Sequence, residues 1–294
     1  MRNLLFIPMA ILMLISCENT QKKEQQEADP LKQSLMLHAS FDKSTKADYA
    51  KGDPKLYNAP SRKSVSDSSV SAIEYSDVKL VANAGKEGGA LQFNDKSSAM
   101  IYYKSKNNLN YDSNNWQGTI SFWLKLDPNQ DLKPGFCDPI QITDVAYNDA
   151  SVWVDFTRDS IRQFRLGVIG DLAVWNPDTI PPNDNPAYMD RLVWVKNPPF
   201  SREQWTHVAI THEKLGSNNG TATLYLNGKL QGTIENLPDP FTWEVEKSNI
   251  YLGINYIGLF DELMIFDKPL SAEQINRLSN IEELKKVLYS SAED

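Results

Sequence analysis

Apolar and polar positions alternate along most of the chain from residue 35 onward. Residues 35–41 read LMLHASF, and residues 120–126 repeat the same period. A period of two is typical of β-strands with one buried face. The pattern predicts further strands at residues 90–93, 100–103, 140–146, 152–157, 164–169, 192–196, 207–212, 221–226, 229–234, 251–253 and 263–266.

Turn residues separate these strands, and one hairpin is sharply defined. Asn227-Gly228 lies between the predicted strands 221–226 and 229–234. A type I′ turn needs positive φ at both central residues, which asparagine and glycine tolerate best. The sequence therefore predicts a β-hairpin over residues 221–234.

A single helix is predicted near the end of the chain. Ser271 followed by Gln274 matches a capping box, and Ile275, Leu278 and Ile281 then fall on one helical face. Many strands, no alternation of strands with helices and one terminal helix predict an all-β protein. We expect two antiparallel sheets packed face to face, with a short C-terminal helix.

The composition is consistent with one large folded domain. The 294 residues include 7 Trp, 12 Tyr and 11 Phe, enough for a sizeable core. A net charge of −8 at pH 7 argues against a polyanion such as nucleic acid as the main partner. Only Cys17 and Cys137 are present, so a disulfide framework is excluded.

The first sixteen residues have the features of an export signal. Arg2 is followed by an apolar run over residues 4–15, which is too short to span a bilayer. Residues 14–17 read LISC and resemble the lipobox of bacterial lipoproteins. The resemblance implies a lipoprotein signal peptide over residues 1–16 and a diacylated Cys17 as the new N-terminus. An ordinary signal peptide with an incidental cysteine is the alternative.

Residues 17–34 are expected to form a flexible tether, because they are polar, poor in apolar side chains and contain Pro30. A lipidated Cys17 would hold the protein at a membrane through its acyl chains. We therefore expect an exported protein anchored to the bacterial cell envelope, with the outer membrane as the expected site. Cys137 is then left without an intrachain partner, as a small buried residue.

Five sequence blocks in a fixed order carry a family resemblance. They read LHASFD, GGALQF, GTISFWLK, WTHVA with LYLNGK, and GLFDELMIFD with PLSAEQI, at residues 37–42, 88–93, 118–125, 205–209 with 224–229, and 258–267 with 269–275. Together they resemble the laminin-G-like branch of the concanavalin A-like lectin/glucanase superfamily. The resemblance implies a jelly-roll β-sandwich over residues 35–294, in which these blocks build the fold. Residues 127–199 are longer than a minimal member needs, so we expect an insertion there that carries the specific function.

The same resemblance implies a structural calcium ion. Family members often hold calcium with one aspartate near the start of the domain and one near its end, and Asp42 and Asp261 lie in the matching motifs. Calcium takes six to eight oxygen ligands, so backbone carbonyls and water would complete the shell. The alternative is that Asp261 accepts hydrogen bonds from local backbone amides and no metal binds.

Motifs of known catalytic machinery are missing from the sequence. Laminarinase-type glycosidases of this superfamily carry Glu-x-Asp-x-(x)-Glu on one strand, which projects the carboxylates into the cleft, and no such run occurs here. Glu244 and Glu246 share a face of an extended segment, but the third acid is missing and Lys247 follows at once, so a solvated strand edge explains them better. No nucleophile elbow, phosphate loop or zinc helix occurs either.

Residues 127–199 offer side chains for sugar binding, which needs flat aromatic surfaces and a few polar groups. In the predicted strands 152–157, 164–169 and 192–196, the period of two directs four candidates away from the core. Two more flank a proline-rich loop. The predicted ligand-binding residues are Trp153, Asp155, Arg165 and Trp194 on the concave face, and Trp175 and Tyr188 beside the loop. The alternative is that the tryptophans fill an outer core under that loop.

These observations predict a lipid-anchored, non-catalytic envelope module that binds a glycan or polysaccharide. The ligand class follows from the family resemblance. A protein-binding or structural envelope module is a second hypothesis, because laminin-G-like domains also recognise proteins. A divergent glycoside hydrolase or lyase is a third, and it would require carboxylates converging near Trp153 and Trp194, with Asp155, Glu244 and Glu246 as candidates.

Overall fold

The computed structural model describes residues 29–67, 77–282, 285 and 288. The predicted signal peptide, Cys17 and most of the predicted tether lie outside these residues. Within the described part of the chain, no helix combines the length and apolarity needed to cross a membrane.

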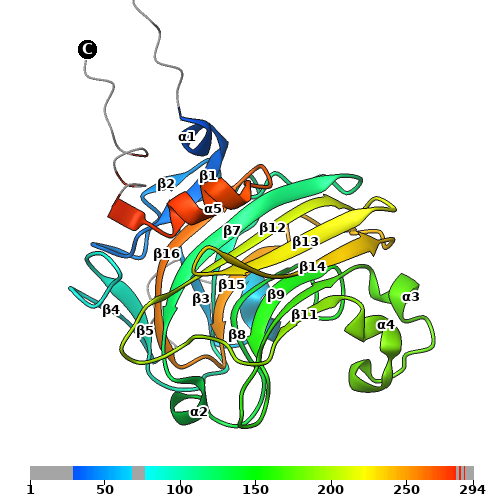
Figure 1. Ribbon diagram of the computed structural model, residues 1–294, viewed down its shortest axis with the longest axis horizontal. Coiled ribbons are helices and arrows are strands. Elements are labelled where there is room, and N and C mark those ends of the chain that lie inside the picture. Colours follow the sequence, from blue (N-terminus) through cyan, green and yellow to red (C-terminus); the bar gives the residue numbers. More distant parts are fainter. Residues whose placement is uncertain (1–28, 68–76, 283–284, 286–287, 289–294) are drawn as a thin grey trace, which may run out of the picture.

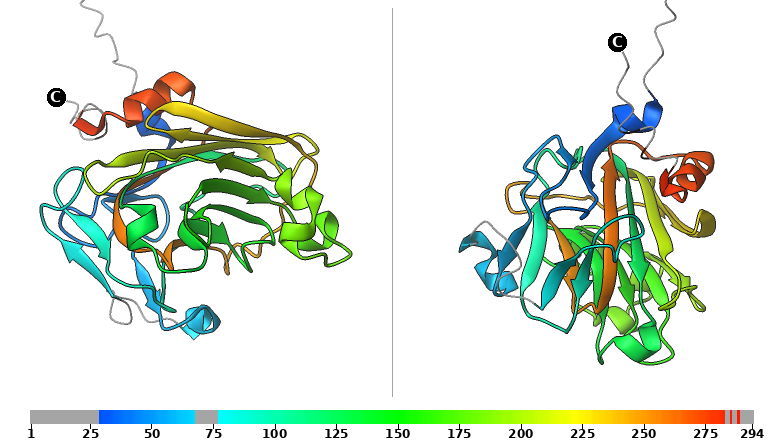
Figure 2. Two further views of the ribbon diagram at one scale, coloured as in Figure 1. Left: turned by 60° about the horizontal axis from the view of Figure 1, so that its bottom comes forward. Right: turned by 90° about the vertical axis from the view of Figure 1, so that its left-hand side faces the viewer.

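Sixteen strands among the described residues form two antiparallel sheets, which lie as two layers in Figures 1 and 2. The seven-stranded sheet has the order β11 (Leu192–Val195), β10 (Phe164–Ile169), β9 (Ser151–Phe156), β8 (Cys137–Thr143), β15 (Asn249–Ile254), β6 (Met100–Lys104) and β3 (Tyr57–Ala59). The nine-stranded sheet has the order β14 (Lys229–Leu237), β13 (Gly220–Leu226), β12 (Thr206–Leu215), β7 (Trp116–Lys125), β16 (Gly258–Phe266), β1 (Leu35–Ala39) and β2 (Tyr49–Ala50), with β5 (Ala90–Phe93) on β16 and β4 (Val78–Val81) on β5. The predicted all-β sandwich is confirmed.

The main hydrophobic core lies between the two sheets. Phe122 on β7 stacks on Phe260 of β16, with ring centroids 5.0 Å apart. Val152 and Val154 of β9 belong to the same buried cluster, and the intervening Trp153 belongs to a different one. The period of two therefore separates an inner from an outer face in β9, as predicted.

The predicted hairpin and helix are both present. Asn227 and Gly228 have φ values of 49° and 73° and join β13 to β14. In α5 (Ala272–Leu278), Ser271 and Gln274 form the capping box. The buried side of α5 packs with Trp123 against the outer face of the nine-stranded sheet.

The folded part of the chain begins earlier than expected. Helix α1 (Pro30–Ser34) covers the end of the segment predicted to be a flexible tether, and Leu31 is fully buried with the residues under α5. Asp29 accepts a hydrogen bond from Leu31 and lies 2.8 Å from the Arg277 guanidinium. These contacts tie residues 29–34 to the sandwich, so the prediction of a tether up to residue 34 is wrong at its end.

Residues 127–199 supply four consecutive strands, β8 to β11, of the seven-stranded sheet. The stretch also contains α2 (Pro128–Asp131), α3 (Leu172–Trp175), the 3₁₀ helix η2 (Pro182–Asp184) and α4 (Pro186–Met189). The predicted insertion is therefore in part an integral section of the sheet. Its longest segment without a strand contains residues 171–191, which we call the strap.

Short strands escaped prediction. β2, β3 and β4 contain two, three and four residues, and β3 is buried along its whole length. Segments this short do not show a measurable period, and a strand buried on both faces shows no alternation. The 3₁₀ helix η1 (Arg62–Asp67) follows β3 and contributes to the site described next.

Candidate functional site

Four of the predicted site residues meet on the outer face of the seven-stranded sheet. Arg165 on β10 pairs in register with Asp155 on β9 and with Trp194 on β11. Trp153 lies two residues before Asp155 and points to the same side. The register between β9, β10 and β11 produces this cluster.

Arg165 is the centre of the cluster. Its guanidinium donates two hydrogen bonds to the two carboxylate oxygens of Asp155, with Nε 2.8 Å from Oδ1. Three aromatic rings surround the same guanidinium, at 4.9 Å for Phe136, 5.1 Å for Trp194 and 5.5 Å for Trp153. Arg165 and Asp155 are both buried, so this ion pair is shielded from solvent.

Trp153 lies in a small outer core rather than on an open surface. Only 1% of it is exposed, and its indole N–H donates to the Tyr147 carbonyl at 2.8 Å. Its ring lies against Gly167, where a Cβ atom would approach the indole to 2.1 Å. The glycine therefore leaves the space that this ring fills.

Trp175 and Tyr188 belong to the same outer core. Trp175 on α3 and Tyr188 on α4 lie with ring centroids 5.7 Å apart, and both are buried with Trp153. The strap folds back over the sheet, and Trp153 and Trp175 fill an outer core under it, which is the alternative given for the tryptophans. Trp175 does not line the pocket described below, whereas one edge of Tyr188 does.

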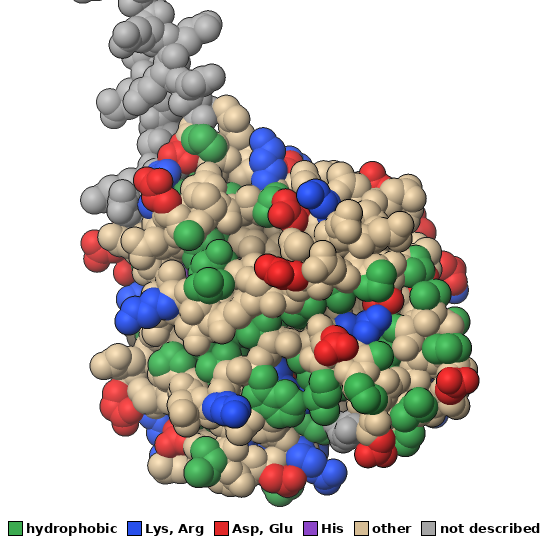
Figure 3. Space-filling model, turned by 45° about the vertical axis from the view of Figure 1, so that its right-hand side comes forward, with side chains coloured by type: hydrophobic (Ala, Val, Ile, Leu, Met, Phe, Trp, Pro, Cys, Tyr) green, Lys and Arg blue, Asp and Glu red, His purple; other side chains and the backbone are tan. Residues whose placement is uncertain are grey.

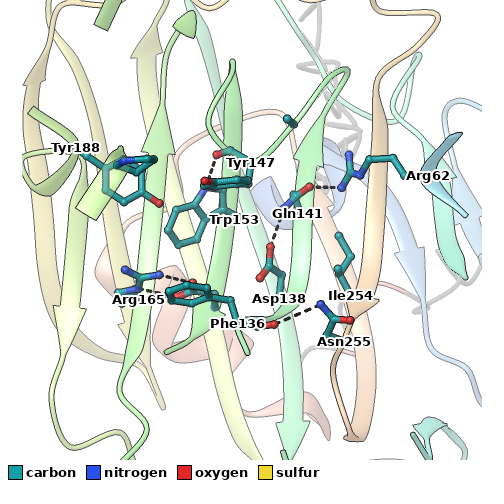
Figure 4. A pocket seen from close by; sticks show the side chains of 13 residues that line it. Arg62, Phe136, Asp138, Gln141, Tyr147, Trp153, Arg165, Tyr188, Ile254 and Asn255 are labelled. Carbon is teal, nitrogen blue, oxygen red and sulfur yellow. Dashed lines mark hydrogen bonds and ion pairs between the residues drawn. The ribbon is translucent and has the colours of Figure 1, made fainter. Parts of the chain in front are cut away.

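A pocket of about 460 Å³ opens beside this cluster, and Figure 4 shows its lining. Tyr188, Trp153 and Tyr147 lie on one side, Arg62 and Asn255 on the other, and Asp138 between them. Asp155, Arg165, Phe136, Gln141, Ala146, Pro182 and Ile254 complete the lining. We call this hollow the sheet pocket.

Two aromatic side chains of the sheet pocket are accessible. Phe136 is 37% exposed and Tyr147 is 43% exposed. Trp194, with 41% exposed, lies outside the lining, and its indole N–H donates to the Gln163 side chain. Flat, accessible rings above buried polar groups are what a sugar ring requires.

The polar groups of the sheet pocket form a chain of hydrogen bonds. The Gln141 amide donates to Asp138 at 2.6 Å and its carbonyl accepts from Arg62. Burial and, next, the nearby negative charge of Asp155 raise the pKa of Asp138 to about 8. Asp138 therefore carries a proton at neutral pH and presents a donor as well as an acceptor.

Several residues of the sheet pocket were not predicted. Gln141 had a usable signal, because it alternates with Ile140 and Ile142 in a predicted strand and must point outward. Arg62 and Phe136 had none, since they lie in η1 and just before β8. Tyr147 lies in a turn between β8 and β9.

The candidate catalytic glutamates lie outside the sheet pocket. The Glu244 and Glu246 side chains are 69% and 73% exposed and pair with Lys247 and Lys106. Asp155 does have an acidic neighbour in Asp138, but both of its oxygens accept hydrogen bonds from Arg165. The three acids named for a hydrolase or lyase do not converge.

Asp42 and Asp261 lie at one corner of the nine-stranded sheet. The Asp261 oxygens accept from the amides of Lys86 at 2.6 Å and Glu262 at 2.9 Å. One Asp42 oxygen accepts from the Gly89 amide at 3.2 Å, and the other lies 3.3 Å from the Lys285 ammonium. The oxygen donors suit calcium in type, but an ion would have to displace Lys285.

Burial and, next, the charge of Glu262 raise the pKa of Asp261 to about 9. Among the residues described, no group of three or more His, Cys, Asp or Glu side chains is placed to hold a metal ion. Calcium at Asp42 and Asp261 stays a prediction.

The two-layer jelly roll with a pocket on one outer face defines the class of fold. A family model described as the concanavalin A-like lectin/glucanases superfamily, Laminin_G_3, matches residues 95–276. The chain belongs to this family, which confirms the predicted laminin-G-like fold.

Solved structures with the same fold include binding domains of larger proteins. Domain 4 of AbnA, a GH43 extracellular arabinanase from Geobacillus stearothermophilus in complex with arabinotriose, is 20% identical, with a TM-score of 0.50 over 84% of this chain and 99% of that one. The receptor-binding domain of botulinum neurotoxin mosaic serotype C/D is 15% identical, with a TM-score of 0.55 over 86% of this chain and 52% of that one. The botulinum neurotoxin serotype G binding domain is 16% identical, with a TM-score of 0.52 over 84% of this chain and 51% of that one. Among curated proteins, none matches the chain.

Proposed function

We propose that this protein is a carbohydrate-binding module and that the sheet pocket holds its glycan. The observation that carries the proposal is the combination of accessible Phe136 and Tyr147 rings with the buried Asp138 and Gln141 and the half-buried Arg62 in one pocket. Its volume lies within the range of about 300–1,000 Å³ that is usual for small-ligand sites. The arabinotriose complex of the AbnA domain is consistent with this ligand class.

The arrangement of the carboxylates in the sheet pocket favours binding without catalysis. A retaining or inverting glycosidase needs two carboxyl groups free to face the scissile bond. In the sheet pocket Asp155 is held by Arg165, which leaves Asp138 as the one acid with capacity to meet a ligand.

A protein ligand is the second candidate, and exposed apolar side chains near the strap favour it. Val174, Ile180, Met189 and Trp194 are 53%, 39%, 38% and 41% exposed. In Figure 3 hydrophobic side chains gather in the lower part of the face drawn. Such surfaces mark contact sites when they are contiguous.

Glycan-array binding followed by calorimetry of the purified full chain tests the carbohydrate proposal. Substituting both Phe136→Ala and Tyr147→Ala is expected to weaken glycan binding about 30- to 1,000-fold, because each lost ring removes about 1–2 kcal/mol of contact. The Tyr147 carbonyl still accepts from Trp153, so the fold is retained. Trp153→Ala is a poorer test, since it would empty the outer core.

Tyr49→Ala is the matched control. Tyr49 is 41% exposed and lies on β2 in the other sheet, so glycan affinity is expected to stay within about twofold. If the folded wild-type protein binds no glycan, the carbohydrate proposal is wrong and the protein-ligand candidate takes its place.

We also propose that Cys17 carries a lipid that anchors the protein to the bacterial envelope. The support is the sequence of residues 1–17 alone. Mass spectrometry of the protein extracted from membranes checks this, and an unmodified cysteine would overturn it.

A further inference from the structure

A second hollow adjoins the sheet pocket on the same face of the seven-stranded sheet. It encloses about 640 Å³, and Arg62 lines both cavities. The Arg62 guanidinium donates to Gln141 on the side of the sheet pocket and lies 4.5 Å from the Tyr251 ring on the other. A ligand longer than the sheet pocket therefore meets this second hollow next.

The floor of the second hollow is aromatic. Tyr102 lies between Tyr57 and Tyr251, with ring centroids 5.6 Å apart on each side. The Lys104 ammonium lies 4.7 Å from the Tyr57 ring, and Arg62 covers Tyr251. Cation–π attraction holds both cations over the aromatic floor of the hollow.

The charges around this floor are unbalanced. Four cations, Arg62, Lys63, Lys104 and Lys247, and two acids, Asp144 and Glu246, line the hollow. Glu246 is paired with Lys106, and Lys247 with Glu244. Among the ion pairs of the described residues, none involves the other three cations.

Two acids near the hollow each accept a hydrogen bond from a neighbouring group. Asp144 accepts a hydrogen bond from the Glu244 amide at 2.8 Å, and Asp53 accepts from the Tyr57 hydroxyl at 2.6 Å. Lys63 and Lys104 are exposed and Arg62 is half-buried. On a chain with a net charge of −8, the lining of four cations and two acids gives this cavity a local excess of positive charge, which favours a negatively charged ligand.

We propose that the second hollow is a subsite for an anionic glycan segment, whose carboxylate or sulfate groups meet Arg62, Lys63 and Lys104. The proposal rests on the glycan function of the sheet pocket and assigns its ligand class. One end of the glycan occupies the sheet pocket, and its acidic units continue past Arg62 into the second hollow. Guanidinium and ammonium groups bind both kinds of anion, so carboxylate and sulfate are separated by experiment.

Calorimetry of the full chain with oligogalacturonate and with its carboxyl-reduced neutral counterpart tests the subsite. The wild type is expected to bind the acidic oligosaccharide at least 10-fold more tightly, with an advantage that falls as salt rises. Lys63→Gln combined with Lys104→Gln is expected to remove most of that advantage and to leave the neutral oligosaccharide within about twofold. A carrageenan oligosaccharide and its desulfated form make the sulfate arm, and a preference there instead assigns the subsite to sulfate esters.

Lys229→Gln combined with Lys268→Gln is the control with the same change in net charge. Both side chains are exposed and lie away from the hollow, on β14 and just after β16. An equal loss in this control would mean a general charge effect and would overturn the subsite. Equal affinity for acidic and neutral glycans in both arms would also overturn it while leaving the sheet pocket as a glycan site. Loss of all glycan binding by the folded wild type would instead overturn the proposed function.

Discussion

Arg165→Met is expected to lower the free energy of unfolding by about 3–5 kcal/mol, because the buried Asp155 carboxylate would lose the one ionic partner it has among the described residues. Asp155 accepts both of its strong hydrogen bonds from this guanidinium, and both side chains are nearly inaccessible. Urea denaturation followed by tryptophan fluorescence measures the change.

Arg202→Met is the matched control for that experiment. Arg202 pairs with Asp131 at the surface, where its side chain is 54% exposed and solvent screens the pair, so a much smaller loss than for Arg165→Met is expected. Replacing Asp155 by Leu in the Arg165→Met background is expected to recover part of the loss, since no unpaired charge remains. Equal effects of the Arg165 and Arg202 substitutions would contradict this account.

Asp138→Asn is expected to stabilise the protein increasingly as pH rises from about 4 to 8. The folded carboxyl has a pKa of about 8 and the unfolded one ionises near 3.8, so the unfolded state releases its proton first. Wild-type stability therefore falls through this window, whereas asparagine has no proton to lose. We expect the variant to gain about 5 kcal/mol on the wild type between pH 4 and pH 9, because the two pKa values differ by about four units and each unit contributes about 1.4 kcal/mol.

Denaturation curves of both proteins across this pH range measure the difference, in which the titration of groups distant from Asp138 cancels. Asparagine still accepts from Gln141, so the hydrogen-bond network is kept. A stability difference that does not change with pH would mean that Asp138 is ionised throughout, and would remove its role as a donor to the glycan.

Strand alternation predicted the half of the site that lies on long strands. Trp153, Asp155, Arg165 and Trp194 each alternate with buried aliphatic residues, so their common face followed from local pattern alone. The alternation predicts the face to which a side chain points but not whether solvent reaches that side chain. Whether an outward ring meets solvent or a covering segment depends on the strap, whose path is set by contacts such as Arg191 with Asp239 at 2.7 Å.

The other half of the site comes from segments far apart in the chain. Arg62 precedes Gln141 by 79 residues, and the two meet because β3, β6, β15 and β8 are neighbours in the sheet. That strand order reflects the crossovers of the jelly roll, which no local pattern encodes. The family resemblance predicted the jelly roll, whereas the position of η1 at the edge of the sheet pocket follows only from the three-dimensional structure.

The two terminal helices and the sheet pocket lie on opposite faces of the sandwich. Helices α1 and α5 lie against the outside of the nine-stranded sheet (Figures 1 and 2). The sheet pocket opens on the outside of the seven-stranded sheet. The described part of the chain therefore begins, at Asp29, on the side of the sandwich that is remote from the sheet pocket. A partner or support held at this end would leave the entrance of the sheet pocket unobstructed.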